Sequence, residues 1–599
     1  MTEQQGNTQG GSERIDQAND FARMAAQAQR IVADFITRQQ KEGLIESKGP
    51  FDVGEAFAEM TQKMMADPAR ILQAQMGLWE DYVNLWQHTA TRMMGGDAGE
   101  PIVKPAADDR RFRAPEWQEN HFFDFIKQSY LLTSNWFLSS VKETQGLDKK
   151  SAQKLAFFTR QYVDALSPTN FALSNPTVLR ETLDSGGENL LRGLSNMLDD
   201  LERGGGTLNI RMSDKGDFTV GENIAVTPGK VIFQNDLIQL IQYAPQTKTV
   251  HTRPLLVVAP WINKFYVLDL KPKNSLIRWA IEKGYTVFAI SWVNPDQALA
   301  HKSFENYMFE GPLAALTAIE AATGEKEVAA VGYCLGGTLL SATLAYMAAK
   351  NDKRITSATF LATLVDFSEP GELGLFIDEE QLTSLKEMMR EKGYLDGGEM
   401  ATTFNLLRAN DLIWSFVINN YLMGREPFPF DLLYWNADST RMPAEMHSFY
   451  LRKMYQENAL VQPGGIELDG VPIDLGKIDV PTYVLAAHDD HIAPWLACFK
   501  ATGLYSGNLR FVLGQSGHIA GVVNPPESNK YSFWTGKITK DESGEDWLSG
   551  AERHEGSWWN DWQRWQSRLA GKKVTAREPG AGKLDVIEDA PGSYVKVRN

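Results

Sequence analysis

A cysteine flanked by glycines, between a strand pattern and a helix pattern, constrains this chain more than any other feature. Residues 328–333 read VAAVGY, a short apolar run, and residues 335–349 read LGGTLLSATLAYMAA, a run rich in helix formers. Cys334 lies between them, with Gly332 and Gly336 at its flanks. A sharp strand-to-helix turn that presents a nucleophile needs both glycines, because a Cβ at either flank would collide with neighbouring backbone. The pattern therefore predicts a nucleophile elbow with Cys334 at its tip.

Short apolar strand patterns alternate with helix patterns on both sides of this turn. The predicted strands lie within residues 252–261, 284–292, 327–333, 357–365 and 480–490, and two helices lie within residues 274–284 and 335–351. Near-continuous apolar strands alternating with helices are typical of a parallel sheet covered on both faces. Between residues 366 and 443 the alternation gives way to helices and loops, and a strand resumes at Thr482. We interpret residues 366–443 as a cap insertion over the carboxyl edge of the sheet.

The first third of the chain lacks this alternation of strand and helix patterns. Residues 1–20 are polar, with almost nothing to bury, and predict a disordered tail. Residues 21–206 show helical periodicity and predict an all-helical N-terminal domain that ends at a glycine linker, residues 204–206. Residues 207–599 then form the predicted catalytic domain.

Two helical stretches of the N-terminal domain carry dense apolar and aromatic residues. One stripe, at alternating spacings of four and three, consists of Leu72, Met76, Trp79, Val83, Trp86, Ala90 and Met93. The other stretch is residues 117–143, WQENHFFDFIKQSYLLTSNWFLSSVKE. An internal helical core is the expected interpretation of both, and a surface for a partner helix or an apolar phase is the alternative.

Composition limits the function. The formal net charge of −16 excludes a general nucleic-acid binder, because such proteins neutralise phosphates with a basic surface. An anionic substrate would therefore need a local cluster of Lys and Arg. Two cysteines in 599 residues exclude a disulfide scaffold and suit a reducing compartment. The chain has no secretory signal and no apolar run long enough to span a membrane, so we expect a cytoplasmic protein.

An activated thiol needs a base and a residue that orients the base. In α/β-hydrolases the nucleophile precedes the acid, and the histidine comes last. Asp490 and His518 follow Cys334 in that order, each in a loop after a predicted strand. The sequence thus predicts an α/β-hydrolase fold with a cap insertion, preceded by an all-helical domain, and a Cys334–Asp490–His518 triad.

Some assignments within this site stay open. Asp489 is the alternative to Asp490, because the sequence pattern does not distinguish neighbouring positions in a turn. His488 and His491 are alternative bases, but we expect both to be structural because they lie too close along the chain to their acid. Cys498 has no flanking glycines and is interpreted as a packing residue.

An oxyanion formed during acyl transfer needs two backbone donors. The amide of Leu335 follows the nucleophile and is one candidate. The second is the amide of Ile262, or of its neighbour Trp261, in the loop after an early strand.

Several blocks resemble class I polyhydroxyalkanoate synthases over nearly the whole chain. They include PWINKFYVLDLKPKNSLIRW, SWVNPD, GYCLGGTLL, YWNADSTRMP, HDDHIAPW, SGHIAGVVNPP and GSWWNDW. The resemblance implies that Cys334, Asp490 and His518 are the family's triad. It implies joining of short-chain (R)-3-hydroxyacyl units from coenzyme A thioesters into a polyester, with no cofactor and no metal. It also implies a homodimer on cytoplasmic polyester granules, an N-terminal region active in dimerisation and granule association, and phasin-like granule proteins as further partners.

Two rival functions fit part of the pattern. A cysteine hydrolase or thioesterase of the same fold would use the same elbow and triad, but it leaves the N-terminal region and the tryptophan-rich GSWWNDWQRWQ without a role. A non-catalytic granule-coat protein would use the apolar helices but not the triad. We expect Trp558, Trp562 and Trp565, which share a helical face, to pack against the catalytic domain.

Overall fold

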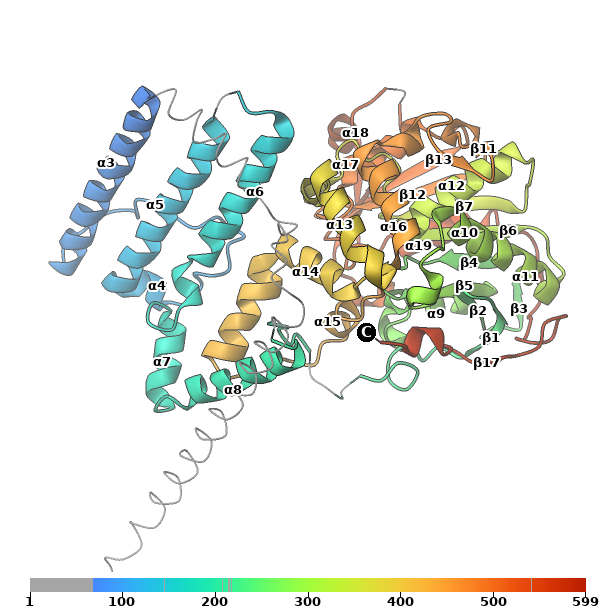
Figure 1. Ribbon diagram of the computed structural model, residues 1–599, viewed down its shortest axis with the longest axis horizontal. Helices are drawn as coiled ribbons and strands as arrows, with labels where there is room; N and C mark the ends of the chain where they lie inside the picture. The colour runs from blue at the N-terminus through green and yellow to red at the C-terminus, as the bar shows by residue number, and fades with distance from the viewer. Residues whose placement is uncertain are drawn as a thin grey trace, which may run out of the picture. The chain divides into compact units, whose positions relative to one another are not determined.

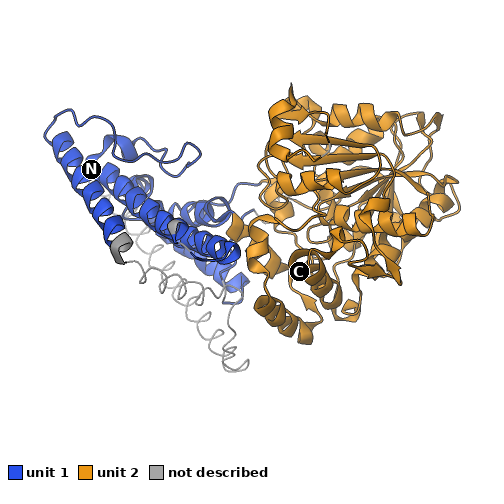
Figure 2. Cartoon of the chain, turned by 90° about the horizontal axis from the view of Figure 1, so that it is seen from above, with its two compact units in different colours: residues 1–214, 408–429 blue, residues 215–407, 430–599 orange. Residues whose placement is uncertain are grey.

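The computed structural model describes residues 68–598, apart from residues 145, 207, 214, 215, 217 and 540. The predicted tail, residues 1–20, and the helical expectation for residues 21–67 lie outside this range. The chain forms two compact units (Figure 2). One contains the chain up to residue 214 together with residues 408–429, and the other contains residues 215–407 and 430–599. In the part of the chain that the structure describes, none of the helices combines the length and the apolar character that crossing a bilayer requires.

The first unit is built from helices, labelled in Figure 1. They are α3 (Pro68–Met93), α4 (Glu116–Glu119), α5 (His121–Glu143), α6 (Lys149–Ala165), α7 (Pro176–Asp184) and α8 (Glu188–Arg203). Asn120, Asp148 and Asn175 cap α5, α6 and α7, because each side chain accepts hydrogen bonds from main-chain amides of the first turn. Helix α5 packs against both α3 and α6.

Most of the apolar stripe of α3 does not face this packing, and only its Trp86 ring lies close to α5, 4.9 Å from the ring of Phe125. Leu72, Met76, Trp79 and Met93 expose between 59% and 72% of their surface. Helix α3 meets α5 through another face, where Leu85 is fully buried and neighbouring side chains hydrogen-bond across the pair. The expectation of an internal core is therefore wrong for most of this stripe, because spacing identifies an apolar face but not the surface that covers it.

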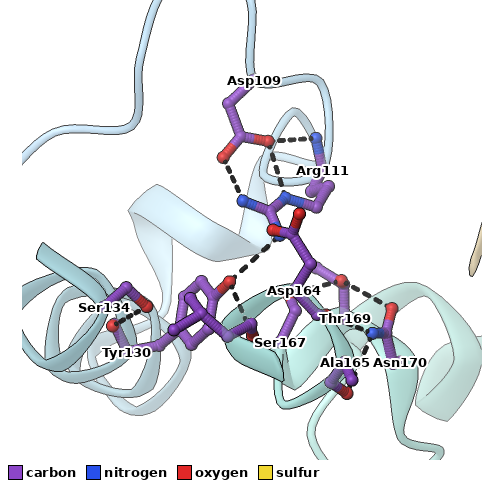
Figure 3. A network of polar contacts seen from close by, with 10 residues as sticks. Asp109, Arg111, Tyr130, Ser134, Asp164, Ala165, Ser167, Thr169 and Asn170 are labelled. Carbon is purple, nitrogen blue, oxygen red and sulfur yellow. Dashed lines mark hydrogen bonds and ion pairs between the residues drawn. The ribbon is translucent and has the colours of Figure 1, made fainter. Parts of the chain in front are cut away.

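A polar network joins α5, α6 and the loop that contains Asp109 and Arg111 (Figure 3). The Arg111 guanidinium donates to both carboxylate oxygens of Asp109, at 3.0 and 2.9 Å, and to Asp164 at 2.9 Å. It also donates to the Tyr130 hydroxyl at 3.0 Å, and the Asn170 amide donates to the Asp164 carbonyl at 2.8 Å. Every charge at the centre of the network is paired, so we regard the network as structural.

Residues 408–429 leave the predicted cap insertion and pack on α8. The side-chain amides of Asn189 and Asn196 donate to main-chain carbonyls of this segment, at 2.8 and 3.0 Å. Gly193 allows the close approach, since a Cβ there would overlap the carbonyl of Tyr421. The helical unit therefore holds the middle of an insertion whose two ends belong to the other unit.

The second unit is built on an 11-stranded sheet with the order β15-β14-β13-β12-β7-β6-β4-β5-β2-β1-β17. These strands are β1 (Gly229–Gln234), β2 (Ile238–Tyr243), β4 (Leu255–Val258), β5 (Val287–Trp292), β6 (Val328–Tyr333), β7 (Ile355–Leu361), β12 (Thr482–Ala487), β13 (Leu509–Gly514), β14 (Ser532–Thr535), β15 (Glu552–Glu555) and β17 (Glu588–Asp589). The run from β13 to β5 is parallel, as predicted. The strands beyond it on both sides are antiparallel, which the prediction of a parallel sheet missed.

Helices surround the sheet (Figure 1). They are α9 (Leu276–Glu282), α10 (Phe304–Met308), α11 (Ala314–Thr323), α12 (Leu335–Ala349), α13 (Glu379–Lys392), α14 (Gly397–Leu407), α15 (Asp431–Asn436), α16 (Ala444–Tyr450), α17 (Trp495–Phe499), α18 (Gly544–Gly550) and α19 (Trp559–Ser567). Three short antiparallel pairs join β3 (Thr249–His251) to β16 (Lys573–Thr575), β8 (Tyr394–Leu395) to β9 (Met442–Pro443), and β10 (Glu467–Leu468) to β11 (Val471–Pro472).

The sheet has an apolar core on each face. In β6, Val328 and Ala330 belong to one buried cluster, and Ala329 and Val331 belong to the other. Successive side chains of a strand point to opposite faces, so a strand buried on both must be apolar throughout. This explains why β6 reads as a continuous apolar run, and it places the residue after β6 at the carboxyl edge of the sheet.

Candidate active site

Cys334 occupies the predicted sharp turn between β6 and α12. Its backbone has φ 51° and ψ −123°, a conformation that L residues rarely adopt, and its amide donates to the Leu361 carbonyl at 2.9 Å. A Cβ at Gly332 would lie 2.5 Å from the Gly337 Cα, and a Cβ at Gly336 would overlap main-chain carbonyls at the end of β4. The two flanking glycines are therefore sterically required, and they hold the thiol at the carboxyl edge of the sheet.

The structure brings Asp490 and His518 together in the loops after β12 and β13. The His518 Nδ1 lies 2.7 Å from Asp490 Oδ2, and the two side chains are 8% and 0% exposed. The other oxygen of Asp490 accepts from the amides of Ile492 and Ala493, at 2.8 and 2.9 Å. These two amides orient the carboxylate, which leaves Oδ2 for the imidazole.

The thiol of Cys334 reaches the same imidazole. Burial disfavours the charged ring of His518, but the charges of Asp490 and Cys334 and hydrogen bonds to both outweigh it and raise the pKa of His518 well above its ordinary value. The Tyr333 ring stacks on that of His518 with 5.4 Å between centroids, and the Tyr333 hydroxyl donates to the His518 carbonyl at 3.2 Å. Thiol, imidazole and carboxylate thus form one connected chain.

Asp489 and Cys498, the alternative acid and the second thiol, have other partners. Asp489 is exposed, and its carboxylate is 2.7 Å from the Nδ1 of His488, so this pair forms a separate contact beside the triad. Cys498 is fully buried, its thiol donates to the Ala493 carbonyl at 3.5 Å, and burial raises the pKa of that thiol well above its ordinary value. A thiol so protonated is a poor nucleophile.

The two candidate oxyanion donors lie at the same edge of the sheet. Leu335 is the first residue of α12, where an amide has no acceptor within the helix. Ile262 follows β4, in a loop that pairs with the returning end of the insertion, because the Thr440 amide donates to the Ile262 carbonyl at 2.9 Å. Lys264, in the same loop, forms a buried ion pair of 2.6 Å with Asp438.

Comparison with known proteins places this site in a family. Residues 108–280 match the family described as poly-beta-hydroxybutyrate polymerase (PhaC) N-terminus, and residues 250–525 match the alpha/beta hydrolase fold. The poly(3-hydroxyalkanoate) polymerase of Methylorubrum extorquens is 50% identical, over 91% of this chain and 90% of its own length. The PhaC subunit of the Cupriavidus necator polymerase is 42% identical, over 89% of both chains. The chain belongs to the PhaC family.

One solved structure with a similar fold is far more distant from this PhaC-family chain than these relatives. A hydrolase from Pseudomonas aeruginosa PA01 is 14% identical, covers 49% of this chain and 92% of its own, and has a TM-score of 0.30. A likeness at this level adds nothing to the assignment of the PhaC family.

The sequence pattern did not point to two tyrosines of this PhaC-family chain that lie near the thiol. Tyr450, at the end of α16, is buried and Tyr455 is half-buried; the two hydrogen-bond to each other and pack around Phe367. Burial raises the pKa of both phenols, and the charge of Cys334 adds to the effect. They come from the segment after the insertion, where no spacing relates them to the elbow. Together with Phe367 they give the surroundings of Cys334 an aromatic character.

Proposed function

We propose that this chain joins short-chain (R)-3-hydroxyacyl units, such as those of 3-hydroxybutyryl-CoA, into a polyester and releases coenzyme A. The proposal includes a covalent acyl intermediate on Cys334. The observation that carries it is the chain of contacts from Cys334 through His518 to Asp490, in a member of a family whose relatives bear the name poly(3-hydroxyalkanoate) polymerase.

The chemistry favours a thiol over a hydroxyl at this position. Attack of a thiolate on a coenzyme A thioester exchanges one thioester for another at almost no cost in free energy. The acyl group therefore stays activated for the next ester bond. A serine would hold the acyl group as an oxygen ester, from which a further ester gains little.

Each cycle uses the triad twice. His518 takes the proton of Cys334, the thiolate attacks the acyl-CoA carbonyl, and the amides of Leu335 and Ile262 stabilise the oxyanion. Coenzyme A leaves as the thiol with a proton from His518. His518, oriented by Asp490, then deprotonates the 3-hydroxyl of a second acyl group, whose oxygen attacks the partner thioester. One ester bond forms, and the thiol is restored. Burial of the imidazole and carboxylate supports this scheme, since water at the thioester would give hydrolysis instead.

Thiol release from 3-hydroxybutyryl-CoA tests the assignment of the nucleophile. We expect Cys334→Ala to abolish release with the fold intact, and Cys498→Ala, the matched control, to retain it. His518→Gln should slow acylation by about 10² to 10⁴, as loss of a general base typically does. Asp490→Asn should still acylate but elongate poorly. Loss of release in Cys498→Ala alone would contradict the proposal.

Product analysis separates a polymerase from a hydrolase of the same fold. Insoluble polyester after coenzyme A release supports the proposal, and stoichiometric free 3-hydroxy acid would identify a hydrolase.

We also propose that the helical unit serves dimerisation and attachment to polyester granules in the cytoplasm. The exposed stripe of α3 supports this role, since an apolar face of this size is costly in water. Met76→Gln with Trp79→Gln should reduce the fraction of protein that sediments with amorphous polyester particles. Glu80→Gln, on the same helix, is the control. Equal sedimentation of the parent, the double variant and Glu80→Gln would contradict granule attachment. Sedimentation in the presence of added phasin-like proteins tests whether such proteins are partners.

A further inference from the structure

The tryptophan-rich segment near the C-terminus has no part in the chemistry described so far. As expected, its indoles are buried against the catalytic core, with Trp558, Trp559 and Trp562 between 1% and 3% exposed. Trp565 is only half-buried. Burial accounts for the rings, but each of the three buried indoles also carries an N–H group that needs an acceptor.

Two of these N–H groups bind the turn that carries His518. The indole of Trp558 donates to the carbonyls of Gly521 and Val522, at 3.0 and 3.2 Å, and that of Trp559 donates to Val522 at 2.9 Å. Val522 is four residues after His518. Two side chains from the start of α19 therefore satisfy adjacent carbonyls at one end of the catalytic turn.

The turn itself has little freedom to move. The Gly521 amide donates to the Gly517 carbonyl at 2.8 Å, which closes the turn around His518. A Cβ at Gly521 would lie 2.8 Å from the Cβ of Ala487, the last residue of β12. The turn is thus wedged between the strand that leads to Asp490 and the two indoles.

We propose that Trp558 and Trp559 are positioning residues, which hold the turn of residues 517–522 so that His518 keeps its contacts with Asp490 and Cys334. The inference rests on the proposed role of His518 as the general base. It assigns a task within the catalytic unit to a segment that a smaller hydrolase would not need. The hydrogen bonds of the two indoles go to Gly521 and Val522 of the turn, so the indoles act through the turn.

The chain offers a matched control in the same helix. Trp562 is as deeply buried as the other two, but its indole donates at 2.9 Å to the Thr359 hydroxyl of β7, away from the catalytic turn. Replacement of any of the three by Phe keeps an aromatic ring and removes one N–H donor. A loss of packing alone would therefore affect Trp562→Phe as much as Trp558→Phe or Trp559→Phe.

The test compares the full-length single variants and the Trp558→Phe/Trp559→Phe double variant with Trp562→Phe. Initial thiol release from 3-hydroxybutyryl-CoA gives kcat and KM, and the pH profile of Cys334 alkylation by iodoacetamide reports the coupling of the thiol to His518. Thermal unfolding reports packing. Misplacement of a catalytic group by about 1 Å costs up to about 100-fold in rate. We expect the double variant to lose about 10- to 100-fold in kcat at similar KM, with a shifted alkylation profile.

Trp562→Phe should keep kcat within about twofold of the parental value and should keep the parental alkylation profile. We expect this even if its melting temperature falls as far as that of the double variant. A double variant with parental kcat and profile, or equal kcat losses in Trp562→Phe, would overturn the inference. If the double variant fails to fold, the two single variants carry the same comparison. Parental thiol release in His518→Gln would instead overturn the proposed function, and the inference with it.

Discussion

The buried ion pair of Lys264 and Asp438 gives a sharp test of how the loop that carries Ile262 is held. The two side chains are 3% and 2% exposed, with 2.6 Å between Nζ and Oδ1. Asp438 also accepts from the Tyr266 hydroxyl at 2.9 Å, and the Lys264 ammonium donates to the Val597 carbonyl at 2.9 Å. Burial lowers the pKa of Lys264 even though Asp438 opposes the shift, so the pair does not fully offset the cost of taking the ammonium out of water.

Removal of one partner leaves the other charge buried. Lys264→Met leaves the Asp438 carboxylate with the Tyr266 hydroxyl and with the half-exposed guanidinium of Arg598, whose Nε lies 3.7 Å from Oδ1. Breaking a buried pair typically costs about 3 to 5 kcal/mol, and the remaining contact with Arg598 places this loss toward the lower end of that range. A second change, Asp438→Asn, removes that charge and should restore a large part of the loss.

Urea unfolding of the full chain, followed by tryptophan fluorescence, measures these free energies, and thiol release measures the effect on the loop. The matched control is Lys230→Met, because the pair of Lys230 and Asp589 is 42% and 79% exposed. Exposed pairs contribute about 0 to 1 kcal/mol. We expect Lys264→Met to cost several times more than Lys230→Met and to slow thiol release. Equal losses in the two variants, or no recovery in Lys264→Met/Asp438→Asn, would refute this reasoning.

Two further predictions concern stability. Burial lowers the pKa of His447 from 6.5 to about 4, so the unfolded chain takes up a proton first as the pH falls below 6.5. Stability present above pH 6.5 is therefore lost toward pH 4, by about 3 kcal/mol in total and about 2 kcal/mol at pH 5. In urea titrations, His447→Gln should lose less free energy of unfolding than the parent between pH 7.5 and 5. His301→Gln, at an exposed position, should behave as the parent. Equal losses in all three proteins would contradict the burial of His447 as the cause. In the helical unit, Gly193→Ala should force the segment around Tyr421 off α8 and destabilise the unit by about 1 to 3 kcal/mol, the usual cost of overpacking. Hydrogen exchange of that segment is the measurement. Gly77→Ala is the control, because a Cβ at Gly77 would meet nothing within 4 Å. Unchanged exchange in Gly193→Ala would exclude the steric argument.

Local chemistry made much of the catalytic unit predictable. The run before Cys334 is apolar at every position because β6 is buried on both faces, and the two flanking glycines follow from the closeness of the helix and of β4. These requirements act within a few residues, so they appear in the sequence as a motif. The chain order of Asp490 and His518 then follows from the order of the parallel strands that carry them.

The antiparallel edges of the sheet were not predictable in the same way. β2 and β14 pair in antiparallel fashion with β5 and β13, the two outer strands of the parallel centre, and this pairing depends on which strand is left unpaired at each edge once that centre has formed. Pattern within a segment does not contain that information.

By itself, then, the sequence determined the sharp turn at Cys334 and the class of sheet around it, because each depends on sterics and burial within one element. Tertiary structure decided what each apolar face meets. It left most of the stripe of α3 exposed, brought residues 408–429 onto α8 and aimed the indoles of Trp558 and Trp559 at the catalytic turn. The physical reason is that hydrophobic burial has no direction, so an apolar pattern shows that a surface is to be covered and does not show by what.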